Sequence, residues 1–115
     1  MRRGDIVDVE IPRPQGKPGH EQFGTRPAVV IQKNEHNANL ATVVVVPMTS
    51  NLKALHRSGV ISVDPDAKNG LAVRSAVLVN QIVTVDKRRV RNQRGVLSSK
   101  DMDRVVELLR SFLDL

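Results

Sequence analysis

The sequence predicts a mainly β protein with one C-terminal helix, built as a small, curled antiparallel sheet or partial barrel. Short alternating or valine-rich segments recur at close spacing over the first two thirds of the 115-residue chain, and the last segment carries apolar residues at helical spacing. Such elements bury their apolar faces most readily as a curled sheet with the helix packed on it. With 40% apolar residues and no internal repeat, residues 1–115 are expected to form a single domain.

The first predicted strand covers Ile6–Ile11, where valine or isoleucine at positions 7, 9 and 11 alternates with carboxylates at 8 and 10. This alternation is typical of a strand with one buried face. Residues 12–24 follow with three prolines and three glycines, which predicts a long loop. Loops of this length in compact domains are usually functional or disordered.

Two continuous apolar runs, Pro27–Gln32 and Thr42–Val46, predict buried central strands with a turn region at Asn34–Asn39 between them. Val60–Val63 predicts a short strand, and the Asn-Gly pair at positions 69 and 70 is a turn signal.

The C-terminal third predicts one long strand and the helix. The strand covers Ala76–Val85, and Asn80 and Gln81 interrupt it with a bulge or an exposed stretch. Ser98 is the predicted N-cap of the helix, and Asp101 favours its N-terminal end. The helix face that packs on the sheet is predicted by one apolar stripe: Met102, Val105, Val106, Leu109, Phe112 and Leu113.

The composition excludes several classes of function. Without cysteine the chain has no disulfide scaffold, no thiolate nucleophile and no cysteine-based zinc or iron–sulfur site. The longest apolar run, Val43–Val46, is far shorter than a membrane span, and the first five residues lack the apolar segment of a secretory signal. We therefore expect a soluble, cytoplasmic protein that is not associated with a membrane.

The positive charge is local. The formal net charge is +6, and five basic residues fall within Lys87–Arg94; without these five, 13 basic residues face 12 acidic ones. A localised basic patch is the footprint of a polyanionic partner, either nucleic acid or an acidic protein. A solvated basic loop is the alternative interpretation.

Familiar catalytic motifs are absent. The sequence holds no phosphate-binding glycine motif, no serine-hydrolase elbow and no histidine pair at metal spacing. We therefore expect no metal site and no cofactor.

Two short segments are candidates for chemistry. In the first, the stretch from Gly19 to Pro27 leads a glycine-flanked loop into a buried strand, and Pro27 holds Arg26 in an extended conformation at the mouth of that strand. In the second, a buried strand ends in three small polar residues, Thr49, Ser50 and Asn51. Their side chains can donate to an anion or cap a turn. For Arg26 the alternative is a purely structural role, as a charged side chain that keeps the end of the strand in water.

Together these segments resemble the MazF/PemK toxins, a family of ribosome-independent endoribonucleases. The resemblance spans essentially the whole chain and is carried by several motifs in the same order: Arg3-Gly4-Asp5, Gly19-His20-Glu21-Gln22 leading into Arg26-Pro27-Ala28-Val29-Val30-Ile31, Pro47-Met48-Thr49-Ser50, and Val79 to Asp86 followed by basic residues. On the first strand, where many relatives carry an aromatic residue, this chain has Asp8 and Val9.

The resemblance implies a CcdB/PemK-like, SH3-like partial barrel that binds single-stranded RNA as a homodimer. It also implies sequence-specific, metal-independent cleavage, in which the RNA 2′-hydroxyl attacks the adjacent phosphate and leaves a 2′,3′-cyclic phosphate and a 5′-hydroxyl. The functional arginine and threonine of the family match Arg26 and Thr49. Its RNA-contacting glutamate and glutamine look like Glu21 and Gln81.

The proton acceptor stays open between Glu21, His20 and a transiently deprotonated Arg26, with Glu21 ranked first because the family loop is similar there. Arg26 is assigned mainly to charge stabilisation. Phe23 is the one aromatic residue outside the helix stripe, and it either stacks on a base or covers the barrel mouth. The remaining predicted RNA contacts are Gln22, Ser50, Asn51, Asn80, Gln81, Lys87, Arg88 and Arg89.

The family resemblance also implies an antitoxin partner, whose acidic or disordered tail the basic run can receive in place of RNA. Two alternative functions remain: a non-catalytic, CcdB-like toxin that inhibits gyrase, and a plain nucleic-acid-binding module without cleavage.

Overall fold

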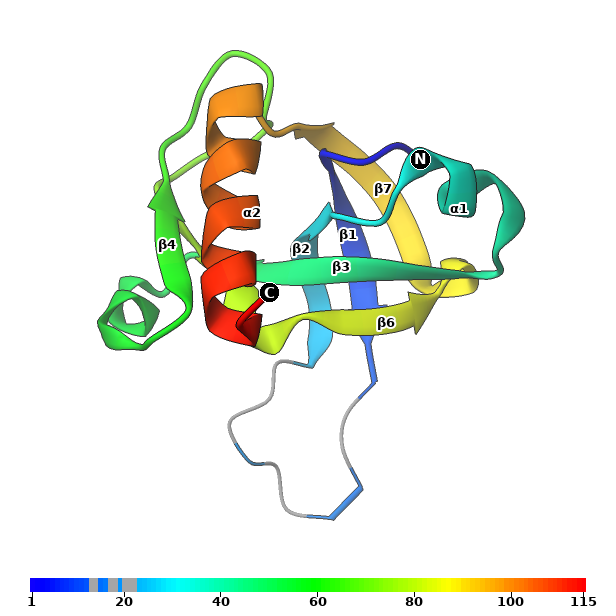
Figure 1. Cartoon of the computed structure of the whole chain (residues 1–115), viewed down its shortest axis with the longest axis horizontal. Helices are drawn as coiled ribbons and strands as arrows, with labels where there is room; N and C mark the ends of the chain where they lie inside the picture. Colours follow the sequence, from blue (N-terminus) through cyan, green and yellow to red (C-terminus); the bar gives the residue numbers. More distant parts are fainter. Residues whose placement is uncertain (13–14, 17–18, 20–22) are drawn as a thin grey trace.

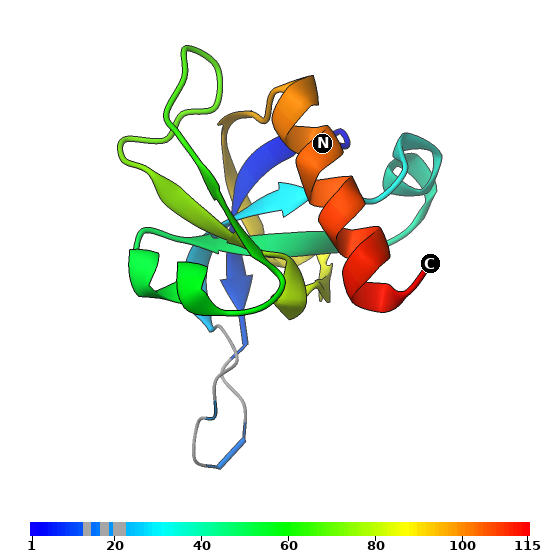
Figure 2. The same ribbon diagram turned by 60° about the vertical axis from the view of Figure 1, so that its left-hand side comes forward.

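The computed structural model describes residues 1–12, 15–16, 19 and 23–115. Its seven strands form one antiparallel sheet in the order β4-β5-β3-β2-β1-β7, with β6 also paired to β3. The strands are β1 (Asp5–Ile11), β2 (Gly24–Val30), β3 (Thr42–Thr49), β4 (Val60–Val63), β5 (Ser75–Leu78), β6 (Val83–Asp86) and β7 (Val90–Val96). The helices are α1 (Asn34–Asn39) and α2 (Ser99–Leu113), with 3₁₀ turns η1 (Leu52–His56), η2 (Val79–Gln81) and η3 (Lys87–Arg89). Figures 1 and 2 show α2 lying across the curled sheet, which confirms the predicted mainly β fold with a C-terminal helix.

The central strands β2 and β3 are buried on both faces because their alternate side chains enter two different clusters. Successive residues of a strand point to opposite faces, so a strand covered on both sides has a continuous apolar sequence. One cluster includes the buried residues of α2: Ile6, Val29, Val46, Met48, Val63, Leu71, Val77, Val79, Leu97, Met102 and Val105. The other lies among β1, β2, β3 and β6: Val7, Val9, Ile11, Ala28, Val30, Val43, Val45 and Val85.

The C-terminal helix begins as the sequence predicts. The backbone N–H of Asp101 donates to the hydroxyl of Ser98, the N-cap, at 3.1 Å. Met102 and Val105 are buried in the core, but Phe112 and Leu113 are 44% and 45% exposed, so the predicted stripe does not reach the last turn. None of the described helices is long and apolar enough to cross a membrane.

The predicted strand at Ala76–Val85 is in fact two strands separated by η2. On β3, Val45 pairs with Val83 of β6 and Met48 pairs with Val77 of β5. Three residues along β3 therefore correspond to six residues along the segment from β5 to β6. The three extra residues match the length of η2, which contains both Asn80 and Gln81. The predicted interruption is confirmed, and the prediction of one continuous strand is wrong.

Two further elements differ from the prediction. The expected turn at Asn34–Asn39 is the helix α1. Its buried residue Asn37 donates from Nδ2 to the carbonyl of Gln32 at 2.9 Å, which holds the helix against the segment that follows β2. The second half of the basic run is the strand β7, which pairs with β1 although most of its residues are polar and exposed. It lies at one end of the strand order, where only one edge is paired and polar side chains remain in water.

Candidate functional site

A cleft opens where β2 and β3 stop pairing. The last pair of this ladder is Ala28 with Pro47, and neither Pro27 nor Pro47 has a backbone N–H to extend it. When this register is continued by two residues beyond the last pair, Arg26 lies opposite Thr49. The cleft has a volume of about 250 Å³ and is lined by Thr25, Arg26, Pro27, Met48, Thr49, Ser50, Leu71, Ala72, Val73, Ser75 and Arg94.

Arg26 reaches the cleft with its guanidinium oriented by its own loop. Its Nε donates to the carbonyl oxygen of Phe23 at 3.3 Å. Among the described residues no carboxylate pairs with it, and its side chain is exposed. The two Nη groups are therefore the donors that a ligand in the cleft would meet.

Thr49 closes β3, with its hydroxyl fixed by the following turn. The backbone N–H of Asn51 donates to Thr49 Oγ1 at 3.1 Å. Because the hydroxyl oxygen accepts this bond, the hydroxyl proton remains to be donated to an anion. Asn51 in turn caps η1, accepting from the Lys53 backbone N–H at 3.1 Å through its Oδ1.

A loop that Asn69 holds together by hydrogen bonds leads into another part of the cleft wall, at Leu71. Asn69 is fully buried, and its Oδ1 accepts from the backbone N–H groups of Asp66 and Leu71 at 3.2 and 3.0 Å. Its Nδ2 donates to the Asp64 carbonyl at 2.9 Å. Leu71, directly after this loop, lines the cleft.

The same loop is packed tightly against β7. A Cβ added at Gly70 would lie 2.2 Å from the carbonyl oxygen of Arg94, and one added at Gly95 would lie 2.3 Å from that of Lys68. Only glycine permits such an approach of two backbones. These contacts hold the backbone of Arg94, which also lines the cleft.

Three of the other predicted residues lie at or beside the cleft. Ser50 lines it and is exposed. Phe23 and Asn51 do not line it, but each forms a hydrogen bond with a residue that does, Arg26 and Thr49 respectively. The structure therefore brings together the two segments that the sequence analysis singled out.

Asn80 and Gln81 do not line the cleft. Both lie in η2, which packs against α2, and the backbone N–H of Asn80 donates to the Gly59 carbonyl at 3.0 Å. The Oδ1 of Asn80 is buried and has no hydrogen-bond partner among the described residues.

The predicted basic contacts Lys87, Arg88 and Arg89 also lie away from the Thr49 end of β3. The backbone N–H of Lys87 donates to the Ala41 carbonyl, beside the opposite end of this eight-residue strand. At about 3.3 Å per residue the two ends are roughly 23 Å apart. The Lys87 ammonium donates to the Asn37 carbonyl, and Arg88 and Arg89 form ion pairs with Asp86 and Glu10.

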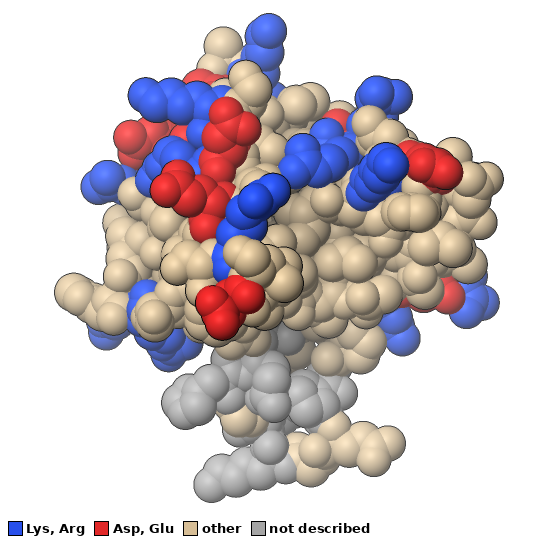
Figure 3. All heavy atoms as spheres, in the orientation of Figure 1, with Lys and Arg blue, Asp and Glu red and all other residues tan. Residues whose placement is uncertain are grey.

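Ion pairs in this region shift the pKa values of Asp86, Arg88 and Glu10. The side-chain hydrogen bond from Arg88 lowers the pKa of Asp86, and the same bond raises the pKa of Arg88. The hydrogen bond from Arg91 lowers the pKa of Glu10, and the nearby charges of Arg91 and Arg89 add to this effect. On the face that carries α2, acidic and basic side chains are intermixed along the helix (Figure 3).

His20, Glu21 and Gln22, which the sequence analysis predicted as proton-transfer and RNA-binding residues, lie outside the described residues.

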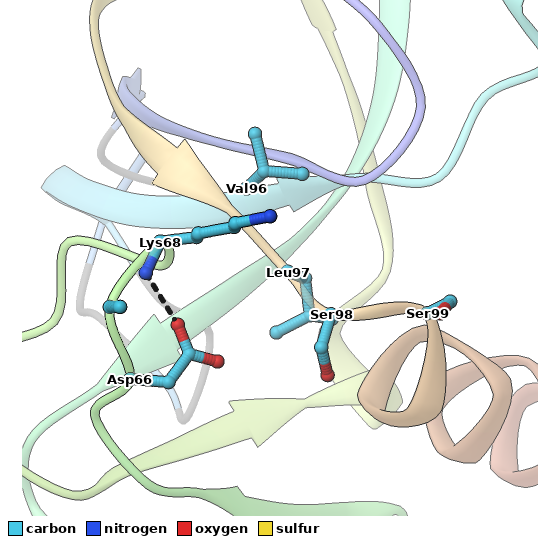
Figure 4. Close-up of a pocket in the computed structure, with 7 residues that line it drawn as sticks. Asp66, Lys68, Val96, Leu97, Ser98 and Ser99 are labelled. Carbon is cyan, nitrogen blue, oxygen red and sulfur yellow. Dashed lines mark hydrogen bonds between the residues drawn. The ribbon is translucent and has the colours of Figure 1, made fainter.

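A separate cavity of about 400 Å³ lies between the Asp66 loop and the start of α2 (Figure 4). Its wall includes Val96, Leu97 and Ser98, and the Lys68 backbone N–H donates to Asp66 Oδ1 there at 2.8 Å. None of the predicted site residues that the structure describes lines this cavity, so it does not compete with the cleft for the chemistry assigned to Arg26 and Thr49.

The match to known proteins covers nearly the whole chain. Residues 2–113 match the family of PemK-like, MazF-like toxins of type II toxin–antitoxin systems. The chain belongs to this family. Among curated relatives of this toxin, a protein of Staphylococcus saprophyticus named Endoribonuclease MazF is 33% identical over 105 residues, which cover 91% of this chain and 84% of that protein.

Solved structures of similar proteins share the fold of the toxin. The crystal structure of MazF from Deinococcus radiodurans is 25% identical, with a TM-score of 0.79 and coverage of 100% of this chain and 97% of that one. A MazE–MazF structure from the same organism is 26% identical, with a TM-score of 0.74 and coverage of 100% and 96%.

The structure adds site residues that the sequence analysis missed, chiefly Arg94, Val73 and Ser75. The sequence analysis placed Arg94 in a basic run without assigning that run to a strand. Reading 90–96 as an edge strand against β1 would have carried Arg94 towards β2 and so towards Arg26. Val73 and Ser75 precede or begin β5 and gave no signal, because their position depends on how the Asn69 loop folds over the cleft.

Proposed function

We propose that this toxin is an endoribonuclease that cuts single-stranded RNA in the cleft between Arg26 and Thr49, at a short specific sequence and without a metal. The RNA 2′-hydroxyl attacks the adjacent phosphorus, which leaves a 2′,3′-cyclic phosphate and a 5′-hydroxyl. The observation that supports this proposal is that Arg26 and Thr49, which come from two separate strand ends, line one cleft. The family to which the toxin belongs and its 33% identical relative support the activity.

The chemistry needs little from the protein beyond donors and a proton acceptor. A bond forms between O2′ and phosphorus while the bond between phosphorus and O5′ breaks, and negative charge gathers on the non-bridging oxygens. The Nη groups of Arg26 and the hydroxyl of Thr49 would donate to those oxygens. Because the nucleophile belongs to the ribose, DNA should not be cut.

One proton must leave O2′ and one must reach O5′. We assign the acceptor to Glu21, with His20 and a transiently deprotonated Arg26 as the alternatives. Glu21 and His20 precede Phe23, whose carbonyl orients Arg26. The pH profile of kcat distinguishes the carboxylate from the imidazole, because Glu21→Gln removes the acidic limb only when Glu21 is the acceptor, and His20→Ala removes it only when His20 is.

RNA recognition is assigned to polar groups around the cleft and to the first three residues of the basic run. Ser50 lines the cleft, Asn51 bonds to Thr49 beside it, and Gln22 and Phe23 belong to the loop before Arg26. Asn80 and Gln81 would read a base beyond the cleft, and Lys87, Arg88 and Arg89 would hold more distant phosphates.

We also infer a cognate antitoxin as the partner, acting on a cytoplasmic homodimer. The similar Deinococcus radiodurans structure is a MazE–MazF pair. An acidic tail would meet the same cations as RNA, so antitoxin and RNA should compete for this surface.

The test is cleavage of a long natural RNA in EDTA by the purified protein and by Arg26→Ala and Thr49→Ala. Each variant should lose about 10²–10³ in kcat, the usual effect of removing one donor to a developing oxyanion. Arg110→Ala and Thr84→Ala are matched controls, since both side chains are exposed and neither lines the cleft. Mass spectrometry should find cyclic phosphate ends, which are lighter than 3′-phosphate ends by one water.

Three outcomes would contradict the proposal. If Arg26→Ala and Thr49→Ala cleave RNA at the wild-type rate, the active-site assignment is wrong. Cleavage that stops in EDTA and returns with magnesium would refute metal independence. If the wild-type protein leaves every RNA substrate intact, a gyrase-inhibiting toxin or a binding module is favoured.

A further inference from the structure

The cleft contains a second arginine, Arg94, for which the proposed reaction has no role. It comes from β7, two strands away from Arg26 in the order β2-β1-β7. Neighbouring strands are about 4.8 Å apart, so β2 and β7 lie roughly 10 Å from each other. The two arginines are also offset along the strands, because Arg26 pairs with Val9 of β1, whereas Arg94 lies level with Ile6 and Val7. Both residues nevertheless line the same cleft.

Arg94 is held at both its backbone and its side chain. Its carbonyl lies against Gly70, where no Cβ fits. Its Nε donates to Oδ1 of Asp8 at 2.6 Å, and the Asp8 side chain is only 15% exposed. A guanidinium fixed in this way loses little rotational freedom when it binds a ligand.

The way Arg94 bonds to Asp8 leaves its outer donors available. Arg88 forms a two-point pair with Asp86, using both Nε and Nη2. Arg94 bonds to Asp8 through Nε alone, and among the described residues neither of its Nη groups has a partner. The Nη groups can therefore bind an anion while Nε keeps its contact with Asp8, and the side chain is 42% exposed.

We propose that Arg94 binds the RNA backbone in the cleft, at a phosphate next to the one being cut. This inference rests on the proposed function, since it assumes that RNA occupies the cleft. Arg26 and Thr49 act on the reacting phosphate, whereas Arg94 holds the strand in place. The loss of Arg94 should therefore raise KM more than it lowers kcat.

The test measures how RNA binding depends on salt. The probe is single-stranded RNA with 2′-O-methyl groups throughout, which lacks the attacking hydroxyl and stays intact. Each phosphate contact contributes about 0.7 to the slope of log Kd against log salt for a single strand. Arg94→Ala should lower that slope by about 0.7 and weaken binding roughly 10- to 100-fold.

A second variant separates the contact from its side effects. Arg94→Ala leaves Asp8 unpaired and lowers the net charge, so it can affect folding and the long-range field. The double variant Asp8→Asn/Arg94→Gln removes both charges and leaves the net charge unchanged. Its slope should stay below the wild-type value by about 0.7, whereas an effect of net charge alone would return it to the wild-type slope.

The chain offers a closely matched control on α2. Arg104 is also 42% exposed and pairs with Asp101, 18% exposed, at 2.9 Å. It does not line the cleft, so Asp101→Asn/Arg104→Gln should bind RNA with the wild-type slope. A wild-type slope in the Arg94 double variant, or an equal decrease in both double variants, would overturn the proposal.

The two proposals fail in different ways. The proposed function fails when Arg26→Ala and Thr49→Ala still cut RNA. The Arg94 inference fails on a binding measurement with an RNA that cannot be cut, whatever the cleavage assay shows.

Discussion

Replacing Asn69 by alanine should destabilise the protein by about 3 kcal/mol, although Asn69 is a polar residue in a loop. The side chain is fully buried and takes part in three hydrogen bonds, with the backbones of Asp64, Asp66 and Leu71. At about 0.5–1.5 kcal/mol each, these bonds contribute roughly 1.5–4.5 kcal/mol. Asp64 and Asp66 are exposed and regain water in the variant, whereas Leu71 is buried, and an unsatisfied N–H there costs about 1–3 kcal/mol.

Urea unfolding measures this cost directly. With typical urea m values of about 1–3 kcal/mol/M, a loss of 3 kcal/mol moves the midpoint by about 1–3 M. Asn92→Ala is the matched control, because Asn92 is exposed in β7 and its replacement should stay within about 0.5 kcal/mol of wild type. A change below about 1 kcal/mol for Asn69→Ala would refute the view that this side chain organises the wall of the cleft.

Three further predictions concern stability. Gly70→Ala places a Cβ 2.2 Å from the Arg94 carbonyl and should cost about 1–3 kcal/mol more than Gly4→Ala, where φ is also positive but no atom lies within 4 Å; equal melting temperatures would contradict this. Met102→Ala, in the core, should cost about 2–5 kcal/mol in urea unfolding and the exposed Leu113→Ala under about 0.5 kcal/mol, and the reverse order would be inconsistent with the packing of α2. The hydrogen bond from Arg91 holds the pKa of Glu10 below its ordinary value of 4.5, so the pair stabilises fully above that pH and the effect is lost as the pH falls through the lower folded-state pKa. Arg91→Ala should therefore lose less stability than wild type on acidification below pH 4.5, and parallel curves would argue against the pair.

The sequence predicts those parts of the fold in which the pattern of side chains reflects burial. The valine runs of β2 and β3 are continuous because both faces are covered, and Ser98 caps α2 as expected. The strand β7 was missed because an edge strand keeps polar side chains in water and so carries no apolar alternation.

The candidate site was predictable for Arg26 and Thr49 because each lies at the end of a recognisable strand. The two strand ends meet because of the register of β2 with β3, and no local sequence pattern predicts that register. Arg94 depends on a longer chain of contacts, through Asp8, Gly70 and the buried Asn69, and no local pattern reveals such a chain. The basic run itself splits between η3, which lies away from the cleft, and β7, which reaches it.

A double-mutant cycle in kcat/KM for RNA cleavage tests most directly whether Arg26 and Thr49 act on one phosphate. The cycle compares wild type, Arg26→Ala, Thr49→Ala and the double variant. Groups that stabilise the same transition state as a unit are strongly non-additive, so the double variant should be little slower than the slower single variant. If the two losses multiply instead, the arginine and the threonine act independently, and the shared active centre is contradicted.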